Sequence, residues 1–282
     1  MLKVLQPGFY ASIQDQGRFG FAEYGVPISG VMDQYAAQFA NALLDNDDSA
    51  SVLEMTMLGG TFQFTEPTVI AIAGADADLK LNDSSVKQHV VLTIKTNDIL
   101  SIGKMTKGFR SYLAVKGGFK SEQVLESCSQ YYPITKTHRI AKNDMIPYET
   151  FKKDYHKQHA TVKFKALHLT QPTLEAFKGP EFDQLSTDQQ NQLINTIFTV
   201  SKNNNRMAYQ LEPLLKNSMQ SIITAPVLPG TVQLTPKGNL IILMRDSQTT
   251  GGYPRVLQLT AASINALAQK SIGKPLKIRL KA

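Results

Sequence analysis

Short apolar runs separated by turn residues make up most of the chain, a pattern typical of β-strands rather than of long helices. Runs rich in β-branched and large apolar residues lie at 90–94, 99–102, 111–115, 231–235, 239–244 and 276–281. The last of them alternates apolar and basic residues, as a half-buried strand does. Pro236-Lys237-Gly238 separates two of the runs, and because proline presets φ and glycine accepts positive φ, it predicts a hairpin.

Three segments show helical spacing. From Met32 the apolar positions recur every three or four residues, and Asp33 is expected in the first turn, where a carboxylate meets the positive end of the helix dipole. Ser186 and Gln189 have capping-box spacing and predict a second helix that buries Leu193, Ile194, Ile197 and Phe198. A third helix is predicted from about Thr260 through Leu267. Many short strands with three isolated helices predict a mainly β fold with a few helices.

The basic, histidine-containing segment at 150–160 is the candidate boundary between two β-rich subdomains, 1–150 and 160–282. Its lysines and histidines are interpreted as a solvated connection rather than as a binding patch. The other basic residues are scattered, so the net charge of +7 is only a weak argument for nucleic-acid binding, and none is expected.

Composition narrows the class of protein. With 42% apolar and 19% charged residues, the 282-residue chain can bury a real core. The single cysteine, Cys128, excludes an intrachain disulfide and metal sites built from several thiolates. No N-terminal signal sequence is apparent, and the best apolar run, 69–75, is too short to span a bilayer. These features predict a soluble cytoplasmic protein that does not bind membranes.

Standard catalytic signatures are missing from the sequence. It contains no phosphate-binding loop, no dinucleotide-binding glycine pattern and no nucleophile elbow. His156 and His159 have a spacing that could bracket a metal, but their lysine-rich surroundings favour a solvated segment, and no metal site is predicted. Cys128 stays open as a nucleophile, although no neighbour in sequence lowers its pKa predictably.

Four polar stretches rich in glycine are the candidate chemistry: Gln14–Gly20, Gly25–Asp33, Gly108–Gly118 and Asp246–Pro254. Glycine allows the backbone to approach a ligand closely. Gln and Thr side chains donate and accept hydrogen bonds, which suits an amide, lactam or urea group, and arginine suits a carboxylate or phosphate. Any one stretch alone is more typical of a tight turn between strands, but four of them in one chain favour a site, although their spacing does not name a substrate.

The same stretches resemble a known family, the allophanate hydrolase subunit 2-like or biotin-dependent carboxyltransferase proteins. The motifs that carry the resemblance are Gln14-Asp15 with Gly17-Arg18, Gly25-Val26-Pro27, Arg110–Gly118, Asn205-Arg206-Met207, Pro229–Gln233, and Asp246 with Gln248–Pro254. They cover nearly the whole chain as one family domain. The family includes the C subunit of bacterial 5-oxoprolinase and part of the carboxyltransferase region of urea carboxylase.

The resemblance implies a cyclophilin-like β-barrel fold and a function shared with partner chains. These partners are a homologous B subunit of the KipI type and an A subunit. Together the three subunits are expected to hydrolyse 5-oxo-L-proline to L-glutamate. ATP is then a co-substrate. Because this chain has no phosphate-binding loop, its ATP site is expected to be of another kind or shared with the partners, and no bound cofactor is expected.

Roles for individual residues follow from this resemblance. Asp15 and Asp246 are the catalytic candidates; they would orient cationic or N–H groups, with general-base work as a further possibility. Substrate binding is assigned to Gln14, Arg18, Arg110, Arg206, Gln233, Gln248, Thr249, Thr250 and Tyr253. The glutamines and threonines would hold the amide or lactam. The arginines would hold carboxylate or phosphoryl oxygens, or form structural ion pairs instead.

Two motifs depart from the family pattern. Where the family usually has Leu-Gly-Ser-Arg-Ser-Thr, this chain has Leu125-Glu126-Ser127-Cys128-Ser129-Gln130, which lacks the glycine and the arginine. Asn205-Arg206-Met207-Ala208 replaces Asp-Arg-Met-Gly. An anion contact made by the first of these loops is therefore in doubt.

Two alternative functions stay open. One is a carboxyltransferase component acting on a urea-like acceptor, which is disfavoured because the chain has no biotin-carrier segment with a central Met-Lys-Met. The other is a regulatory protein that binds and antagonises a KipI-type kinase inhibitor. One surface could serve both an enzyme subunit and a regulator, so the sequence does not separate them.

Overall fold

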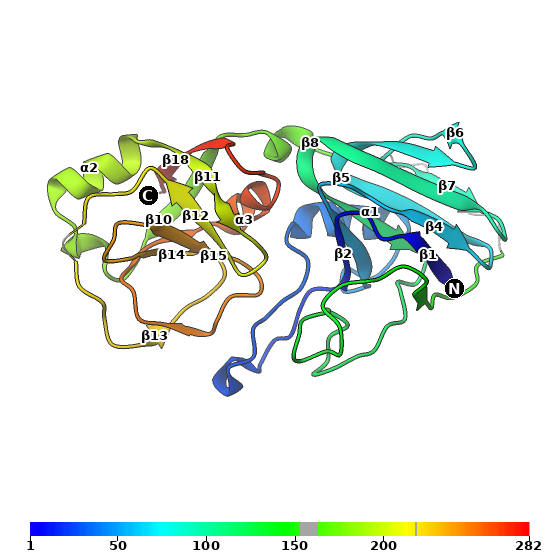
Figure 1. Ribbon diagram of the computed structural model, residues 1–282, viewed down its shortest axis with the longest axis horizontal. Coiled ribbons are helices and arrows are strands. Elements are labelled where there is room, and N and C mark those ends of the chain that lie inside the picture. The colour runs from blue at the N-terminus through cyan, green and yellow to red at the C-terminus, as the bar shows by residue number, and fades with distance from the viewer. Residues whose placement is uncertain (153–162, 218, 282) are drawn as a thin grey trace. The chain divides into compact units, whose positions relative to one another are not determined.

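A computed structural model describes residues 1–152, 163–217 and 219–281. They form two compact units, drawn in Figure 1. The N-terminal unit contains Met1–Arg18 and Ser29–Leu169, and the C-terminal unit contains Phe19–Ile28 and Thr170–Ala282. Strands account for 39% and helices for 14% of the structure, which confirms the predicted mainly β fold with two β-rich parts. Most of the predicted boundary segment, 150–160, lies outside the described residues.

A single curled sheet of nine strands forms the N-terminal unit. Its main path runs β2-β3-β8-β4-β1-β9, and β5 pairs with β6, β7 and β8. The strands are β1 Leu2–Gln6, β2 Tyr10–Gln14, β3 Val52–Thr56, β4 Thr61–Phe64, β5 Thr68–Leu81, β6 Ser84–Ser85, β7 Val91–Ile94, β8 Ile99–Val115 and β9 Met145–Ile146. The runs predicted at 99–102 and 111–115 are thus two parts of one long strand, β8.

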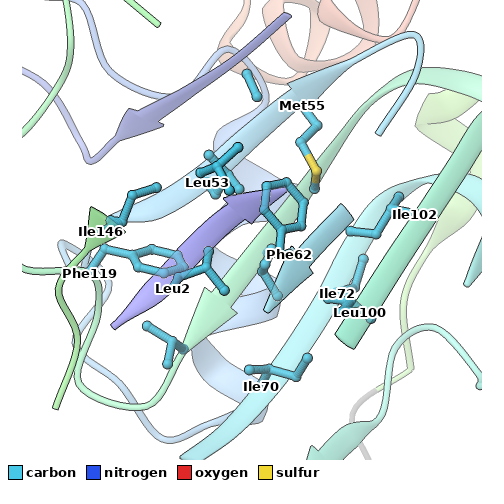
Figure 2. Close-up of a cluster of buried hydrophobic side chains, with 14 of the residues drawn as sticks. Leu2, Leu53, Met55, Phe62, Ile70, Ile72, Leu100, Ile102, Phe119 and Ile146 are labelled. Carbon is cyan, nitrogen blue, oxygen red and sulfur yellow. The ribbon is translucent and has the colours of Figure 1, made fainter. Parts of the chain in front are cut away.

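Both faces of this sheet are buried, which explains its continuous apolar run at 69–75. Ile70 and Ile72 of β5 belong to one cluster, together with residues of β1, β3, β4 and β8 (Figure 2). The alternating residues Val69, Ala71 and Ala73 face a second cluster, in which helix α1, Gln34–Leu43, covers the sheet. Alanines on that side keep the sheet surface flat, so the helix can pack closely on it.

The C-terminal unit is built around a closed barrel, in agreement with the predicted barrel type. Seven strands follow one another in the order β10-β17-β14-β15-β12-β11-β18, and β18 closes the barrel by pairing in parallel with β10. They are β10 Thr173–Lys178, β11 Ile197–Asn204, β12 Ala208–Glu212, β14 Thr231–Leu234, β15 Leu240–Leu243, β17 Arg255–Leu259 and β18 Pro275–Leu280. The predicted hairpin is confirmed, because β14 and β15 pair antiparallel around Pro236-Lys237-Gly238.

The three predicted helices exist, with two corrections at their ends. Asp33 precedes α1 as its N-cap and accepts a hydrogen bond from the Ala36 amide, rather than lying within the first turn. Helix α2, Thr187–Asn195, has the predicted capping box but ends before Ile197 and Phe198, which belong to β11. The β-branched and aromatic residues at 196–200 favour the extended strand, and Ile197 is exposed rather than buried. Helix α3, Ala261–Ala268, starts after its N-cap Thr260.

No helix within the described ranges is long and apolar enough to cross a membrane.

Candidate functional site

The first polar stretch holds a loop of its own unit. The Asp15 carboxylate accepts hydrogen bonds from the Gly17 amide at 2.8 Å, the Ser127 hydroxyl at 2.6 Å, the Cys128 amide at 2.5 Å and the Ser129 hydroxyl at 2.7 Å. Three of these donors bind Oδ1, and the Cys128 amide binds Oδ2. Asp15 is therefore the anchor of the segment Ser121–Tyr131, called the 121–131 loop below.

Gln14 and Arg18 bind the same loop. The Gln14 side-chain amide donates to the Gln130 carbonyl at 3.1 Å. The Arg18 guanidinium donates to the carbonyls of Val124 and Ser129. Both side chains are almost fully buried. Three residues predicted to act at a site are thus brought together, and each of them contacts the 121–131 loop.

The departure from the family pattern falls at the turn of this loop. Val124 and Ser127 form an isolated bridge, and the two residues between them, Leu125 and Glu126, have positive φ values of 51° and 61°. Residues with a side chain rarely adopt this conformation, whereas glycine adopts it freely. Glu126 occupies the glycine position of the family pattern expected from the sequence, and glycine is the residue best suited to this backbone. Burial raises the pKa of the Cys128 thiol, which disfavours the reactive thiolate.

The second stretch packs directly on the first. The Val31 amide donates to the Asp15 carbonyl at 2.9 Å. Gly30 has a φ of 85°, and a Cβ atom there would lie 2.7 Å from the Gln16 carbonyl oxygen. Only glycine fits this close approach, so residues 15–17 and 30–31 pack together within the N-terminal unit.

Arg110, from the third stretch, belongs to a separate buried cluster of the N-terminal unit. Its guanidinium lies 3.8 Å from the Glu54 carboxylate, which also accepts the Met32 amide at 2.8 Å. The neighbouring Tyr112 hydroxyl accepts the Asp33 amide at 2.8 Å. These contacts attach the start of α1 to strands β3 and β8. Arg110 therefore takes part in a structural ion pair, one of the two roles expected for it.

His168 completes this cluster and was not predicted. Its Nε2 lies 2.8 Å from the Asp33 carboxylate and its Nδ1 lies 3.1 Å from the Lys165 carbonyl. Both partners can only accept, so the ring satisfies both when it is doubly protonated. Burial by itself lowers the pKa of His168, but the hydrogen bond and charge of Asp33 outweigh it and the net pKa is raised above 6.5. With no free ring nitrogen, His168 is suited to holding η2, Ala166–Leu169, rather than to proton transfer.

In the C-terminal unit, Arg206 and Asp246 form an ion pair, one of the two roles expected for the arginine, with a partner that the sequence did not predict. The guanidinium binds the carboxylate in bidentate fashion, with Nε–Oδ2 at 2.8 Å and Nη2–Oδ1 at 3.1 Å. Both side chains are buried, and the Asp246 amide donates to the Arg206 carbonyl at 2.9 Å. The pair fixes the point at which the chain leaves β15 and enters the fourth stretch.

Two glutamines beside that stretch have polar atoms without a partner. Among the described residues, no hydrogen-bond partner reaches the buried Gln233 Nε2, a donor, or the buried Gln248 Oε1, an acceptor. The Gln233 amide lies against Gly251, where a Cβ atom would come within 2.3 Å of Nε2. A buried polar group without a partner costs about 1–3 kcal/mol, which points to a role for these atoms beyond folding.

A second segment runs alongside the fourth stretch. Residues 222–227, called the strap below, contain β13, Ala225–Pro226, which pairs with β16, Thr250–Gly251. The Ile222 amide donates to the Gly252 carbonyl at 2.9 Å and the Val227 amide to the Thr249 carbonyl at 3.0 Å. Thr250 and Tyr253 are exposed on this stretch. Gln233, Gln248 and residues 249–253 are therefore neighbours in the C-terminal unit, and they are called the ledge below.

The strap is also attached to a pair that was not predicted, Glu181 and Arg255. Arg255 binds the Glu181 carboxylate through Nε at 3.0 Å and Nη2 at 2.8 Å, and its Nη1 donates to the Pro226 carbonyl at 3.0 Å. The hydrogen bond from Arg255 lowers the pKa of Glu181 below 4.5. Sequence contained a signal for this pair, since Gly179-Pro180 and Tyr253-Pro254 flank its two members, but not their pairing.

Each unit thus contains a different set of the predicted site residues. Gln14, Asp15 and Arg18 meet at the 121–131 loop, Arg110 lies in the α1 cluster, and the other predicted residues surround the ledge. Within the described ranges, no group of three or more His, Cys, Asp or Glu side chains is placed to hold a metal ion.

A barrel and a curled sheet carrying these motifs define a class of protein. The family model for the carboxyltransferase domain, subdomains A and B, matches residues 24–280, so the chain belongs to this carboxyltransferase-domain family. The resemblance inferred from the motifs is thereby confirmed.

Individual relatives narrow the comparison. The chain is 32% identical to the C subunit of 5-oxoprolinase from Escherichia coli, over 98% of its own length and 90% of that protein. It is 39% identical to urea amidolyase of Saccharomyces cerevisiae over 46% of its length and 7% of that protein. The crystal structure of the K. lactis urea amidolyase superimposes with a TM-score of 0.87 and 25% identity, covering 100% of this chain and 19% of that chain.

Proposed function

We propose that this chain is the C-type subunit of an ATP-dependent 5-oxoprolinase, which acts in the cytoplasm together with A and B subunits. The observation that carries the proposal is the near full-length identity to the C subunit of a bacterial 5-oxoprolinase, over 98% of this chain and 90% of the relative. A match limited to one domain of a larger enzyme would leave the complex unspecified, whereas this match spans almost the whole of both chains.

The ledge is where the lactam would bind. A lactam carries a carbonyl acceptor and an N–H donor, which complement the donor Gln233 Nε2 and the acceptor Gln248 Oε1. Thr249, Thr250 and Tyr253 border the same place and would contact the ring and its substituent. Asp246 holds the Arg206 guanidinium in a fixed direction, which supports an orienting role for Asp246 rather than that of a general base.

Asp15 receives an orienting role for the same reason. Its carboxylate accepts four hydrogen bonds within its own unit, three at Oδ1 and one at Oδ2, and these bonds fix its position in the loop. Gln14, Asp15 and Arg18 would shape the 121–131 loop as a surface toward substrate or partner.

In the reaction, water cleaves the ring C–N bond of 5-oxoproline while ATP is hydrolysed to ADP and phosphate. The ATP site is assigned to the assembly, because the chain has no phosphate-binding loop.

Carboxyl transfer to a urea-like acceptor is the second candidate. It is favoured by the description of the matching family model and by the TM-score of 0.87 to a urea amidolyase. A urea-like group also combines a carbonyl acceptor with N–H donors, so the ledge suits it as well. This reaction would need carboxybiotin from another chain.

The test is to co-express the chain with candidate A and B subunits and to measure ATP hydrolysis that depends on 5-oxoproline. Turnover that requires all three chains supports the proposal. An assembled complex that hydrolyses no ATP in response to 5-oxoproline rules it out. Activity that requires biotin and bicarbonate instead supports carboxyl transfer.

The same assay tests the ledge. Gln248→Ala should lower kcat/KM by about tenfold or more, since it removes one hydrogen-bonding group aimed at the substrate. The complex should still assemble. Gln192→Ala is the matched control, because Gln192 is exposed on α2 and should leave kcat/KM unchanged. Equal activity of both variants would assign Gln248 to folding alone.

A further inference from the structure

The strap depends on few anchors. It makes two backbone hydrogen bonds to the fourth stretch besides the short β13–β16 pair. Val227 at its end is buried, but Ile223 is 94% exposed and Thr224 and Pro226 are exposed as well. A short segment with so few buried contacts is expected to open locally unless another group holds it.

Arg255 is the group placed to do so. Two hydrogen bonds from its side chain to the Glu181 carboxylate fix the plane of the guanidinium. In this orientation Nη1 donates a hydrogen bond to the Pro226 carbonyl. Pro226 lies opposite Thr250 in the β13–β16 pair. Since proline has no amide hydrogen, the strap cannot donate a backbone hydrogen bond at this position, and the bond that Arg255 donates to the Pro226 carbonyl is an additional anchor.

The base of the arrangement is rigid. Glu181 is 9% exposed and its carboxylate also accepts the Arg255 backbone amide at 2.8 Å. Gly179 packs so closely on Arg255 that a Cβ atom there would lie 2.1 Å from the Arg255 carbonyl oxygen. The residues just before the barrel strand β17 are therefore fixed against the turn at 179–181.

We propose that Arg255, held by Glu181, is a positioning residue that fixes the strap and through it the ledge, in particular its residues 249–252. It acts on the site through Pro226 and Thr250 and does not itself touch the substrate. Lysine cannot replace it, because one ammonium group cannot bind a carboxylate in bidentate fashion and reach the Pro226 carbonyl in a fixed direction. The effect on turnover rests on the proposed function, whereas the effect on the strap does not.

The experiment compares Arg255→Lys with Arg279→Lys. Arg279 pairs with Glu175 at 2.5 Å in the same unit, but this exposed pair links β18 to β10 rather than to the strap, so it is the matched control. Hydrogen exchange is followed at the Ile222 and Val227 amides and at amides of β14 and β17. Glu181→Gln serves as a second variant, because it keeps the size of the side chain and removes the charge that orients Arg255.

Arg255→Lys should speed exchange at Ile222 and Val227 by about tenfold or more while β14 and β17 keep their protection. Glu181→Gln should have a smaller effect at the same amides, and Arg279→Lys none. In the assembled complex, Arg255→Lys should raise KM more than it lowers kcat, as expected when a binding surface loses its fixed geometry.

Unchanged exchange in the strap would overturn the proposal, and so would a uniform rise across the barrel, which would mean a merely structural role. A loosened strap with no effect on KM or kcat in an active complex would overturn its link to the site. If the wild-type complex shows no turnover with 5-oxoproline, the proposed function fails, while the exchange data still decide whether Arg255 fixes the strap.

Discussion

Glu126 has a backbone conformation that favours glycine. It has a φ of 61°, a conformation that costs a residue with a side chain about 1–2 kcal/mol and costs glycine almost nothing. The greater conformational entropy of glycine in the unfolded chain offsets part of this relief of strain. Glu126→Gly should therefore stabilise the protein by about 0.5–1 kcal/mol in net terms. Urea unfolding measures the change. Glu122→Gly, in the same loop but without positive φ, is the control and should destabilise instead. Equal losses for both variants would mean that Glu126 is not strained.

His168 should make the stability of the protein depend on pH. Its pKa in the folded state is raised above 6.5, the value expected for the unfolded chain. Its contribution is therefore fully present below 6.5 and is lost as the pH rises through the folded-state pKa. The free-energy difference between wild type and His168→Gln in urea unfolding should be larger at about pH 5.5 than at about pH 9. The burial-lowered pKa of His89 affects both proteins alike and cancels. A difference independent of pH would show that the ring is neutral throughout.

At the scale of elements, the two adjacent glycines of the fourth stretch should behave differently. A methyl group at Gly251 would displace the Gln233 amide, whereas at Gly252 its nearest neighbour is the Ile222 carbonyl at 3.5 Å, an ordinary contact. Because the Gln233 side-chain end is flexible, Gly251→Ala should cost less than about 1 kcal/mol in unfolding free energy. In the assembled complex it should lower kcat/KM by about tenfold or more. Gly252→Ala should change neither quantity appreciably. A similar loss of activity for both variants would point to the backbone rather than to Gln233.

Local signals predicted most elements, and long-range pairing decided what they did not predict. The capping box of α2, the hairpin at Pro236-Lys237-Gly238 and the alternation of β18 each depend on neighbouring residues, so the sequence contains the evidence for them. The predicted end of α2 was wrong, because the helical spacing of apolar residues continued into a segment whose β-branched residues favour the strand β11.

For the candidate site residues too, local signals identified single residues but not their distant partners. Glycine-rich stretches identified Asp15 and Asp246, and the family resemblance identified Arg206, but their partners are separated from them by up to 114 positions, as with Ser129 and Asp15. His168 and Asp33 are 135 positions apart, and no spacing rule joins them. The polar atoms of Gln233 and Gln248 could be recognised as unpartnered only once the fold had placed their neighbours.

At the scale of the whole molecule, the curled sheet and the closed barrel each have a core of their own, and this can be tested with two matched leucines. Leu113 lies on β8 between β3 and β5, and Leu257 lies on β17 between β10 and β14; both are at most 1% exposed. Replacing either by alanine should cost about 2–5 kcal/mol, because the cavity that forms cannot be filled by its neighbours. If the cores are independent, Leu113→Ala should speed hydrogen exchange in β3, β5 and β8 while the barrel strands keep their protection, and Leu257→Ala should do the reverse. Faster exchange throughout the chain in both variants would instead mean that the two units unfold as one cooperative structure.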